Sequence, residues 1–194
     1  MYKSRGFTLL ELMLVIAIVA ILIAFAVPSF QWMIQKVTIS SNVNTFLSDM
    51  RYARSEGIRR GGGVVLCRSD APEAAAPTCS SGSSGNGWVS GWIIFHDLDK
   101  SGGTSEPGKA ADPLLRVQAP IIAINSILGT LPDNSSSTTT FNFTATGRLR
   151  NLNGVTKMRF GVATMFAETA QRVVCVSLSG RARIAGDGSI SSCG

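Results

Sequence analysis

Two short basic motifs in the second half of the chain have the residue types needed to bind phosphate. The pattern Gly-Arg-x-Arg occurs at Gly180, Arg181 and Arg183, and a second copy upstream contains Arg148 and Arg150. In a β-strand the first and third of three residues point to the same face, so two guanidiniums can extend from one strand toward a phosphate backbone. A guanidinium donates paired hydrogen bonds to phosphate oxygens, and glycine allows a tight turn and close approach of a ligand. The motifs therefore predict a site for a polyanion such as DNA.

The distribution of charge favours the same interpretation. The formal net charge is +6, and residues 145–194 hold seven basic and two acidic residues, which leaves +5 in the last quarter of the chain. Concentrated positive charge indicates an anionic partner such as nucleic acid, a lipid headgroup or an acidic protein surface. The alternative is a hairpin with solvated arginines and no ligand. Aromatic residues are sparse among these arginines, so any binding is expected to involve the nucleic-acid backbone rather than the bases.

No other group of residues predicts catalysis or a cofactor. The chain has one histidine, His96, and its four cysteines have no spacing typical of a zinc site. We therefore expect no enzyme activity, no metal and no cofactor. The cysteines form two local pairs in sequence, Cys67 with Cys79 and Cys175 with Cys193, which indicates disulfides and an oxidising compartment. Other pairings remain open, because connectivity cannot be deduced from spacing alone.

The N-terminal segment combines a long apolar run with one acid. Residues 12–35 carry no formal charge, which is long enough for a helix to cross a hydrocarbon core of about 30 Å. An ordinary secretory signal or a plain membrane anchor explains this length. Neither explains Glu11, because an unpaired carboxylate in such a stretch costs about 3 kcal/mol. Cleavage after Gly6 would give Phe7 a free amine one helical turn from Glu11, and this amine would supply the missing partner.

The elements expected to carry these residues are a long helix and a β-rich head. Apolar residues recur with helical period up to a glycine run at 61–63, which predicts an amphipathic helix; they are Ile39, Val43, Phe46, Leu47, Met50 and Ala53. Arg51 and Arg54 lie on this helix and are expected to face the head or a filament, so they serve as controls for DNA binding. The expected strands are 64–67, 88–95, 114–118, 121–127, 138–143, 158–163, 172–178 and 181–184.

These elements define an α+β fold. Short strands separated by polar turns favour two small antiparallel sheets over βαβ units. We expect a long N-terminal helix packed on a small antiparallel β-sandwich head. The expected organisation is a leader at 1–6, a transmembrane or filament-core helix at 7–35, an amphipathic half of the helix at 36–60 and the head at 61–194.

The N-terminal sequence Lys-Ser-Arg-Gly-Phe-Thr-Leu-Leu-Glu-Leu, residues 3–12, resembles the class III leader of type IV pilins and type II secretion pseudopilins. The segments 64–67, 87–97, 141–143 and 172–183 are similar to the FimT, FimU and GspH group of minor pilins and pseudopilins. The resemblance covers essentially the whole chain. It implies cleavage between Gly6 and Phe7 by a prepilin peptidase, N-methylation of Phe7 and a role for Glu11 in filament assembly.

The resemblance also implies partners and a location. It implies other major and minor pilins as partners, and the inner membrane before assembly, with the head in the periplasm and later in an extracellular pilus. FimT-like members of naturally transformable bacteria bind DNA through a Gly-Arg-x-Arg element, which this chain matches at Gly180, Arg181 and Arg183. Two alternatives stay open. One is a GspH-like pseudopilin of type II secretion without a role in nucleic-acid binding, and the other is a purely structural subunit of a pilus tip.

Overall fold

The computed structural model describes residues 8–80, 87–99, 112–131, 137–150, 152–161 and 166–193, apart from the side chains of 25–29. The chain divides into two compact units, Met1–Val37 and Thr38–Gly194. One helix, α1 (Leu9–Arg60), continues from the first unit into the second. Gly6 and Phe7, the expected cleavage and methylation positions, lie outside the described residues.

In the first unit α1 begins where the Thr8 hydroxyl accepts a hydrogen bond from the backbone N–H of Glu11 at 3.2 Å. The Glu11 side chain is exposed, as are the described side chains around it. Near the end of the unit, Nζ of Lys36 lies 3.5 Å from the centre of the Trp32 ring. Among the described residues no helix is both long and apolar enough to cross a membrane, and the transmembrane segment expected at 7–35 is not confirmed.

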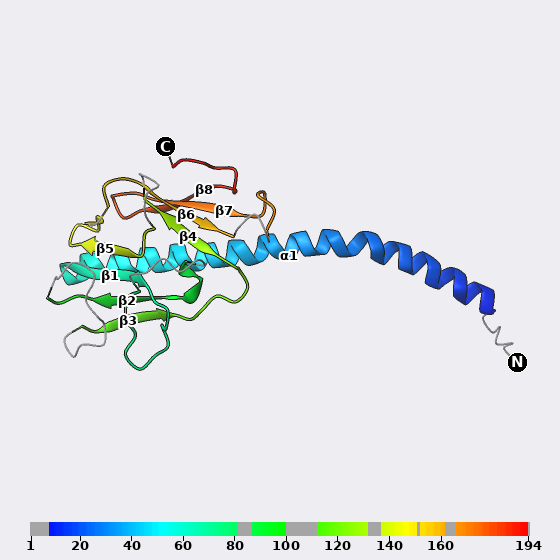
Figure 1. Ribbon diagram of the computed structural model, residues 1–194, viewed down its shortest axis with the longest axis horizontal. Coiled ribbons are helices and arrows are strands. Elements are labelled where there is room, and N and C mark those ends of the chain that lie inside the picture. The colour runs from blue at the N-terminus through cyan, green and yellow to red at the C-terminus, as the bar shows by residue number, and fades with distance from the viewer. Residues whose placement is uncertain are drawn as a thin grey trace, which may run out of the picture. The chain divides into compact units, whose positions relative to one another are not determined.

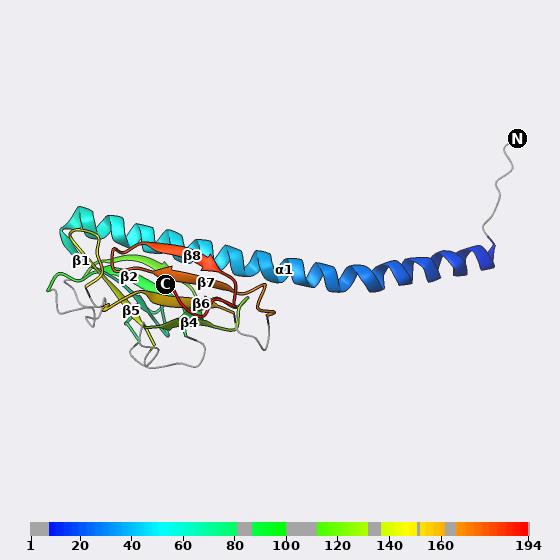
Figure 2. The ribbon, with the colours of Figure 1, turned by 90° about the horizontal axis from the view of Figure 1, so that it is seen from above.

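The second unit contains the end of α1 and two four-stranded antiparallel sheets (Figures 1 and 2). The first sheet has the order β3-β2-β1-β5, and its strands are β1 (Gly62–Arg68), β2 (Trp92–His96), β3 (Leu114–Gln118) and β5 (Thr140–Thr144). The second has the order β4-β6-β7-β8, and its strands are β4 (Ile127–Thr130), β6 (Thr156–Phe160), β7 (Arg172–Val176) and β8 (Ala182–Gly186). The expected pair of small antiparallel sheets is therefore confirmed.

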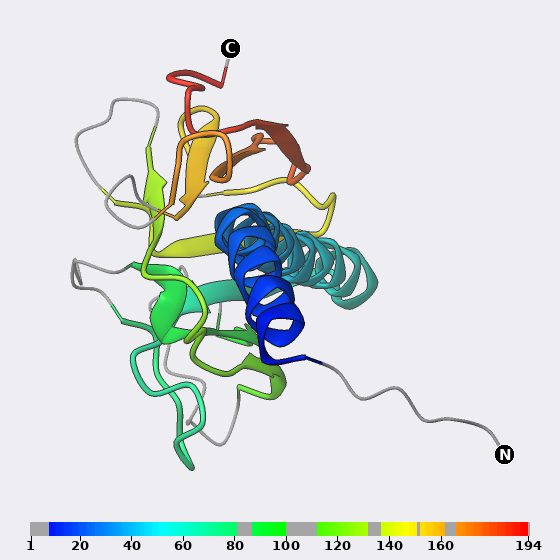
Figure 3. The same cartoon turned by 90° about the vertical axis from the view of Figure 1, so that its right-hand side faces the viewer.

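One core joins the helix to both sheets. The apolar stripe predicted from Ile39 to Ala53 is buried, which confirms the amphipathic half of α1. Phe46 lies at its centre, with ring-centroid distances of 5.7 Å to Trp92 of β2 and 5.7 Å to Phe160 of β6. Because these rings come from different sheets, both sheets pack on the same face of the helix. In Figure 3 the first sheet lies below and the second sheet lies above this shared face of the helix.

Two of the expected strands are wrong in part. The segment expected as one strand at 88–95 is a 3-10 turn, Trp88–Ser90, followed by β2. The break falls at Gly91, which has φ +103°, and a Cβ there would lie 2.5 Å from the Gln118 carbonyl oxygen. The strand expected at 121–127 is irregular until β4 begins at Ile127. Ile121 and Ile124 of this irregular part are buried, whereas Ile122 is exposed. The apolar pattern therefore reflects partial burial of the segment and not pairing in a sheet.

Both expected disulfides are present. Cys67 of β1 is bonded to Cys79, and Cys175 of β7 is bonded to Cys193. The first holds the loop after β1 against a small apolar cluster formed by Val65, Cys67, Ile93 and Phe95. The second holds the C-terminal segment beside β7, where Nζ of Lys157 also donates a hydrogen bond to the Ser191 carbonyl at 2.9 Å. The C-terminal residues are therefore fixed next to the strand that precedes Arg181.

A candidate phosphate-binding groove

The Gly-Arg-x-Arg motif at 180–183 lies in the tight turn that joins β7 to β8. Gly180 has φ +72° and donates its N–H to the Ser177 carbonyl at 2.9 Å. The Arg181 carbonyl accepts hydrogen bonds from the backbone N–H and the hydroxyl of Ser177 at 2.9 and 3.1 Å. Arg181 and Arg183 are exposed, whereas Ala182 between them packs against the core. Alternation along the strand therefore places both arginines at the surface.

The second copy of the motif, at 147–150, packs directly against the first. The N–H of buried Leu149 donates to the Leu178 carbonyl at 2.9 Å. A Cβ at position 180 would lie 2.2 Å from the Gly147 carbonyl oxygen, so only glycine allows the two turns to approach this closely. Arg148 and Arg150 are exposed on either side of Leu149. The structure thus brings together two motifs that the sequence alone did not place side by side.

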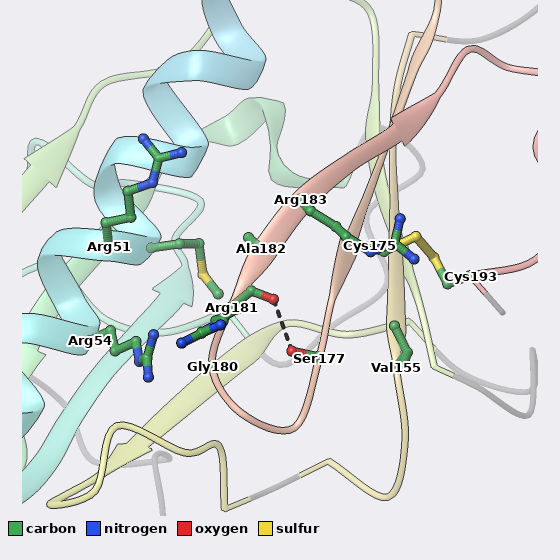
Figure 4. A pocket seen from close by; sticks show the side chains of 11 residues that line it. Arg51, Arg54, Val155, Cys175, Ser177, Gly180, Arg181, Ala182, Arg183 and Cys193 are labelled. Atoms are coloured by element: carbon green, nitrogen blue, oxygen red, sulfur yellow. Dashed lines mark hydrogen bonds between the residues drawn. A yellow bond between two sulfur atoms is a disulfide. The ribbon is translucent and has the colours of Figure 1, made fainter.

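A groove of about 520 Å³ lies between α1 and the β7–β8 hairpin. Its lining includes Arg181 and Arg183 from the hairpin and Arg51 and Arg54 from the helix, but not Arg148 or Arg150. In Figure 4 the Arg181 side chain extends toward Arg54, and the Arg183 side chain extends toward the Cys175–Cys193 disulfide. The two hairpin arginines therefore spread along the groove instead of converging on one point.

The floor of the groove is mainly apolar, and its walls are cationic. Met50, Val155, Ala182 and the Cys175–Cys193 disulfide line it beside the arginines. Nε of Arg54 donates a hydrogen bond to the Gly147 carbonyl at 3.2 Å, which fixes this guanidinium next to the two glycine turns. No acidic side chain is among the described residues that line the groove. A bound anion would meet arginine on both walls without competition from a carboxylate.

Several other arginines of the head are already neutralised by carboxylates. Glu56 binds Arg59 and Arg60, with 2.7 Å between its Oε2 and Nε of Arg60. Hydrogen bonds from Arg59 first and Arg60 second lower the pKa of Glu56 to about 2, against desolvation, which would raise it. These two arginines stabilise the C-terminal end of α1, because their positive charges interact favourably with the negative end of the helix dipole. They are structural and are not available to a ligand.

Arg116 is another arginine with a carboxylate partner, and it lies at the edge of the core. Nη1 of Arg116 lies 2.6 Å from Oδ1 of buried Asp49, and the Arg116 guanidinium stacks 4.1 Å from the centre of the Tyr52 ring. The other Asp49 oxygen accepts a hydrogen bond from Nε1 of Trp92 at 2.8 Å. This ion pair links α1 to the sheet of β3, β2, β1 and β5. The sequence analysis did not identify it.

The arginines of the groove and of the two motifs are different. Within the described parts of the chain they have no carboxylate partner; they are Arg51, Arg54, Arg148, Arg150, Arg181 and Arg183. An unneutralised guanidinium attracts an anion more strongly than a paired one, because the local potential is not cancelled. The groove brings several such arginines together, which makes it a candidate anion-binding surface.

The use of Arg51 and Arg54 as controls outside the site is wrong. Both line the groove, because each directly follows a buried position of the helical stripe, Met50 or Ala53. A residue next to the buried stripe lies at its border, where the helix meets the sheet edge. That position was the available signal in the sequence. It becomes informative only when the β7–β8 hairpin is known to pack beside it.

The close approach of the glycine turns leads to a prediction about stability. Gly180→Ala is expected to destabilise the protein by more than about 2 kcal/mol, because φ is positive and the new Cβ would collide with Gly147. The melting temperature should fall by roughly 5 °C or more. Gly61→Ala is the matched control, since its φ is +76° but nothing lies within 4 Å of a Cβ there. Equal losses for the two variants would show that the contact between the turns is not tight.

A long N-terminal helix whose second half packs on two small antiparallel sheets, with an arginine groove at one edge, is the architecture of a pilin-like filament subunit. The family model described as "Type II transport protein GspH" matches residues 42–180, and the model described as "Prokaryotic N-terminal methylation motif" matches residues 1–27. The chain belongs to the GspH family of pilin-like subunits, which are structural proteins and not enzymes. The GspH match ends at Gly180, so Arg181 and Arg183 lie just beyond it.

Individual relatives agree with this assignment. The chain is 36% identical over 85 residues to the prepilin peptidase-dependent protein D of Escherichia coli, covering 44% of this chain and 49% of that protein. It is 55% identical over 40 residues to the fimbrial protein EcpB of Eikenella corrodens, covering 21% of this chain and 25% of EcpB. The chain therefore spans half or less of these relatives.

A solved structure shares the fold. The type IV minor pilin FimU of Pseudomonas aeruginosa matches with a TM-score of 0.51 and 18% identity, over 80% of this chain and 95% of FimU. At this identity the likeness concerns the fold, and it confirms the expected arrangement of one N-terminal helix packed against antiparallel sheets.

Proposed function

We propose that the protein is a minor pilin of a type IV pilus whose head binds the phosphate backbone of DNA through Arg181 and Arg183. The observation that carries this proposal is the unneutralised arginine groove beside the joined Gly-Arg-x-Arg turns. Arg148 and Arg150, which are exposed next to the groove, extend the positive surface. A subunit of this kind would contribute to filament-tip assembly and to DNA capture for natural transformation.

The groove favours binding without sequence preference. No aromatic residue is among its described lining residues, so bases have no stacking platform there. Phe160 and Phe166, the aromatics that lie between the two motifs in the sequence, are buried in the core. Contacts to phosphate alone give an affinity that depends on salt and hardly on sequence.

A salt titration tests this function. The full chain, kept soluble in a neutral detergent, is titrated against two fluorescent DNA duplexes of unrelated sequence at several salt concentrations, and anisotropy reports binding. We expect equal affinities for the two sequences and a linear fall of log K with log salt concentration. If no binding is detected even at low salt, the DNA function is wrong and a purely structural pilus-tip role remains.

The N-terminal residues carry a second part of the proposal. The methylation motif at residues 1–27 supports cleavage between Gly6 and Phe7 by a prepilin peptidase, with N-methylation of Phe7. Glu11 is exposed in the isolated chain, so its carboxylate is free to pair with the new amine of Phe7 or of a neighbouring subunit. The subunit would be assembled with other major and minor pilins from the inner membrane, its head first in the periplasm and then in the extracellular pilus.

Processing and assembly lead to a prediction for Glu11. Mass spectrometry of the mature protein is expected to find a methylated N-terminus at Phe7. Glu11→Leu should leave the amount of membrane-bound protein unchanged but reduce its incorporation into sheared filaments at least several-fold, because the amine loses its partner. Glu11→Asp, which keeps the charge, is the control and should retain part of the incorporation. A mature terminus elsewhere, or normal incorporation of Glu11→Leu, would contradict this role.

A pseudopilin of type II secretion is the alternative, and the description of the matching family model favours it. The two functions predict different effects of deleting the gene. Deletion would abolish secretion of folded proteins in the alternative, whereas it would impair pilus assembly or DNA uptake under the main proposal. Neighbouring genes for a secretion apparatus would also favour the alternative.

A further inference from the structure

The helix side of the groove has two arginines with the spacing of a second phosphate-binding wall. Arg51 and Arg54 are three residues apart on α1, so their Cβ atoms lie about 5–6 Å apart on neighbouring positions of the helix surface. Arg181 directly precedes β8 and Arg183 is its second residue, so the two are about 7 Å apart along an extended chain. Phosphates of one nucleic-acid strand recur about every 3.4 Å along a duplex axis, so each pair spans one or two steps.

The two helix arginines are also free to act on a ligand. Arg51 is exposed and makes no hydrogen bond or ion pair with the described residues. Among the described residues Arg54 bonds only through Nε, which donates to the Gly147 carbonyl. This bond fixes the plane of the guanidinium, and its terminal nitrogens have no other partner there. A guanidinium held in this way loses less freedom when it binds a phosphate.

Charge repulsion across the groove points to an anion between the walls. Figure 4 shows Arg54 from α1 and Arg181 from the hairpin extending toward each other, and both line the groove. Two guanidiniums that face each other without a carboxylate repel, and a phosphate placed between them replaces that repulsion with two favourable contacts. The floor beneath them, with Met50 and Ala182, is apolar and offers no competing charge.

We infer that Arg51 and Arg54 are phosphate-binding residues, and that one phosphodiester strand runs along the groove between α1 and the β7–β8 hairpin. This inference rests on the proposed DNA binding and adds to it a second wall and a path for the ligand. The strand is either a free single strand or one backbone of a duplex, since both present the same chemistry to the two walls.

The test uses the full chain in neutral detergent and two probes, a labelled single-stranded oligonucleotide and the duplex of the same sequence. Arg51→Gln is the main variant, because this side chain makes no hydrogen bond or ion pair with the described residues. It should weaken binding several-fold and flatten the salt slope by about 0.9 for the duplex or about 0.7 for the single strand. Arg51→Gln/Arg54→Gln should roughly double both effects, and Arg54→Lys should keep most of the affinity.

The control is Arg159→Gln/Arg172→Gln, which removes two charges at positions that neither line the groove nor form an ion pair with a carboxylate among the described residues. It should change the slope by much less than the double variant of the helix wall. If the helix-wall variants bind both probes more weakly, the groove accepts a free strand and one backbone of a duplex alike. If they bind only the single strand more weakly, the ligand of the groove is a free strand. If Arg181→Gln/Arg183→Gln weakens binding but Arg51→Gln matches the control, the second wall is wrong while the proposed function stands. If the unmodified chain binds neither probe, the proposed function itself fails.

Discussion

Replacing Arg181 and Arg183 together with glutamine is expected to lower the affinity for every DNA sequence by the same factor. Each phosphate contact contributes about 0.9 to the slope of log K against log salt concentration for a duplex, so the slope should flatten by about two. Both side chains are exposed in the groove and neither bonds a carboxylate among the described residues, so their loss removes ligand contacts rather than structural ones. Anisotropy titrations of the full chain at several salt concentrations measure the effect.

The surrounding arginines provide graded comparisons for this experiment. Arg148→Gln/Arg150→Gln should give a smaller loss, because these residues are exposed near the groove but do not line it. Arg159→Gln/Arg172→Gln is the charge-matched control outside the groove. Equal losses for all three double variants would mean that only net charge matters and that the hairpin motif is not a site. An unchanged slope for the Arg181 and Arg183 variant would remove the site assignment directly.

Phe46→Ala is expected to have the largest effect on stability. Phe46 is fully buried and its ring meets Trp88, Trp92, Phe141 and Phe160, with centroid distances of 5.7 to 6.2 Å. Truncation leaves a cavity where the helix and both sheets meet, at a cost of about 3–5 kcal/mol. For a unit of this size the melting temperature should fall by on the order of 10 °C. Thermal unfolding followed by near-ultraviolet circular dichroism measures it.

Phe30→Ala serves as the control for the same truncation at a non-core position. The Phe30 side chain is exposed in the first unit, so its loss should leave the melting temperature of the head unchanged. A decrease of less than about 1 kcal/mol for Phe46→Ala would show that the two sheets do not share the helix as a common core. In that case the groove would lack the rigid support that its two walls require.

The features that the sequence determined are local ones. The helical stripe from Ile39 to Ala53 is visible because burial of one helix face imposes a period of 3.6 residues on neighbouring positions. The disulfides Cys67–Cys79 and Cys175–Cys193 join residues 12 and 18 positions apart, within the reach of a short loop. The exposure of Arg181 and Arg183 follows from alternation along one strand. Each of these depends on residues close together in the chain.

Local pattern failed where a single backbone position decides the outcome. Trp88 and Trp92 have the spacing of one strand face, but Gly91 breaks the segment and places Trp88 in a 3-10 turn, where its Nε1 donates to the Thr138 carbonyl at 2.7 Å. Ile121 and Ile124 are buried although their segment forms no strand, and Ile122 between them is exposed. Apolar side chains reveal burial, but hydrogen-bonded pairing depends on which backbone lies alongside.

Only the tertiary structure decided which arginines share a site. The contact between Gly180 and Gly147 depends on the order of the strands in two sheets, and no local period encodes that order. The same packing places Arg51 and Arg54 of the helix in the groove opposite Arg181. It also brings Arg116 next to Asp49, so that these two residues form an ion pair. The composition and the two motifs indicated that the chain has arginines suited to binding phosphate. Long-range packing determined which of them are neutralised by carboxylates and which face one another across an open groove.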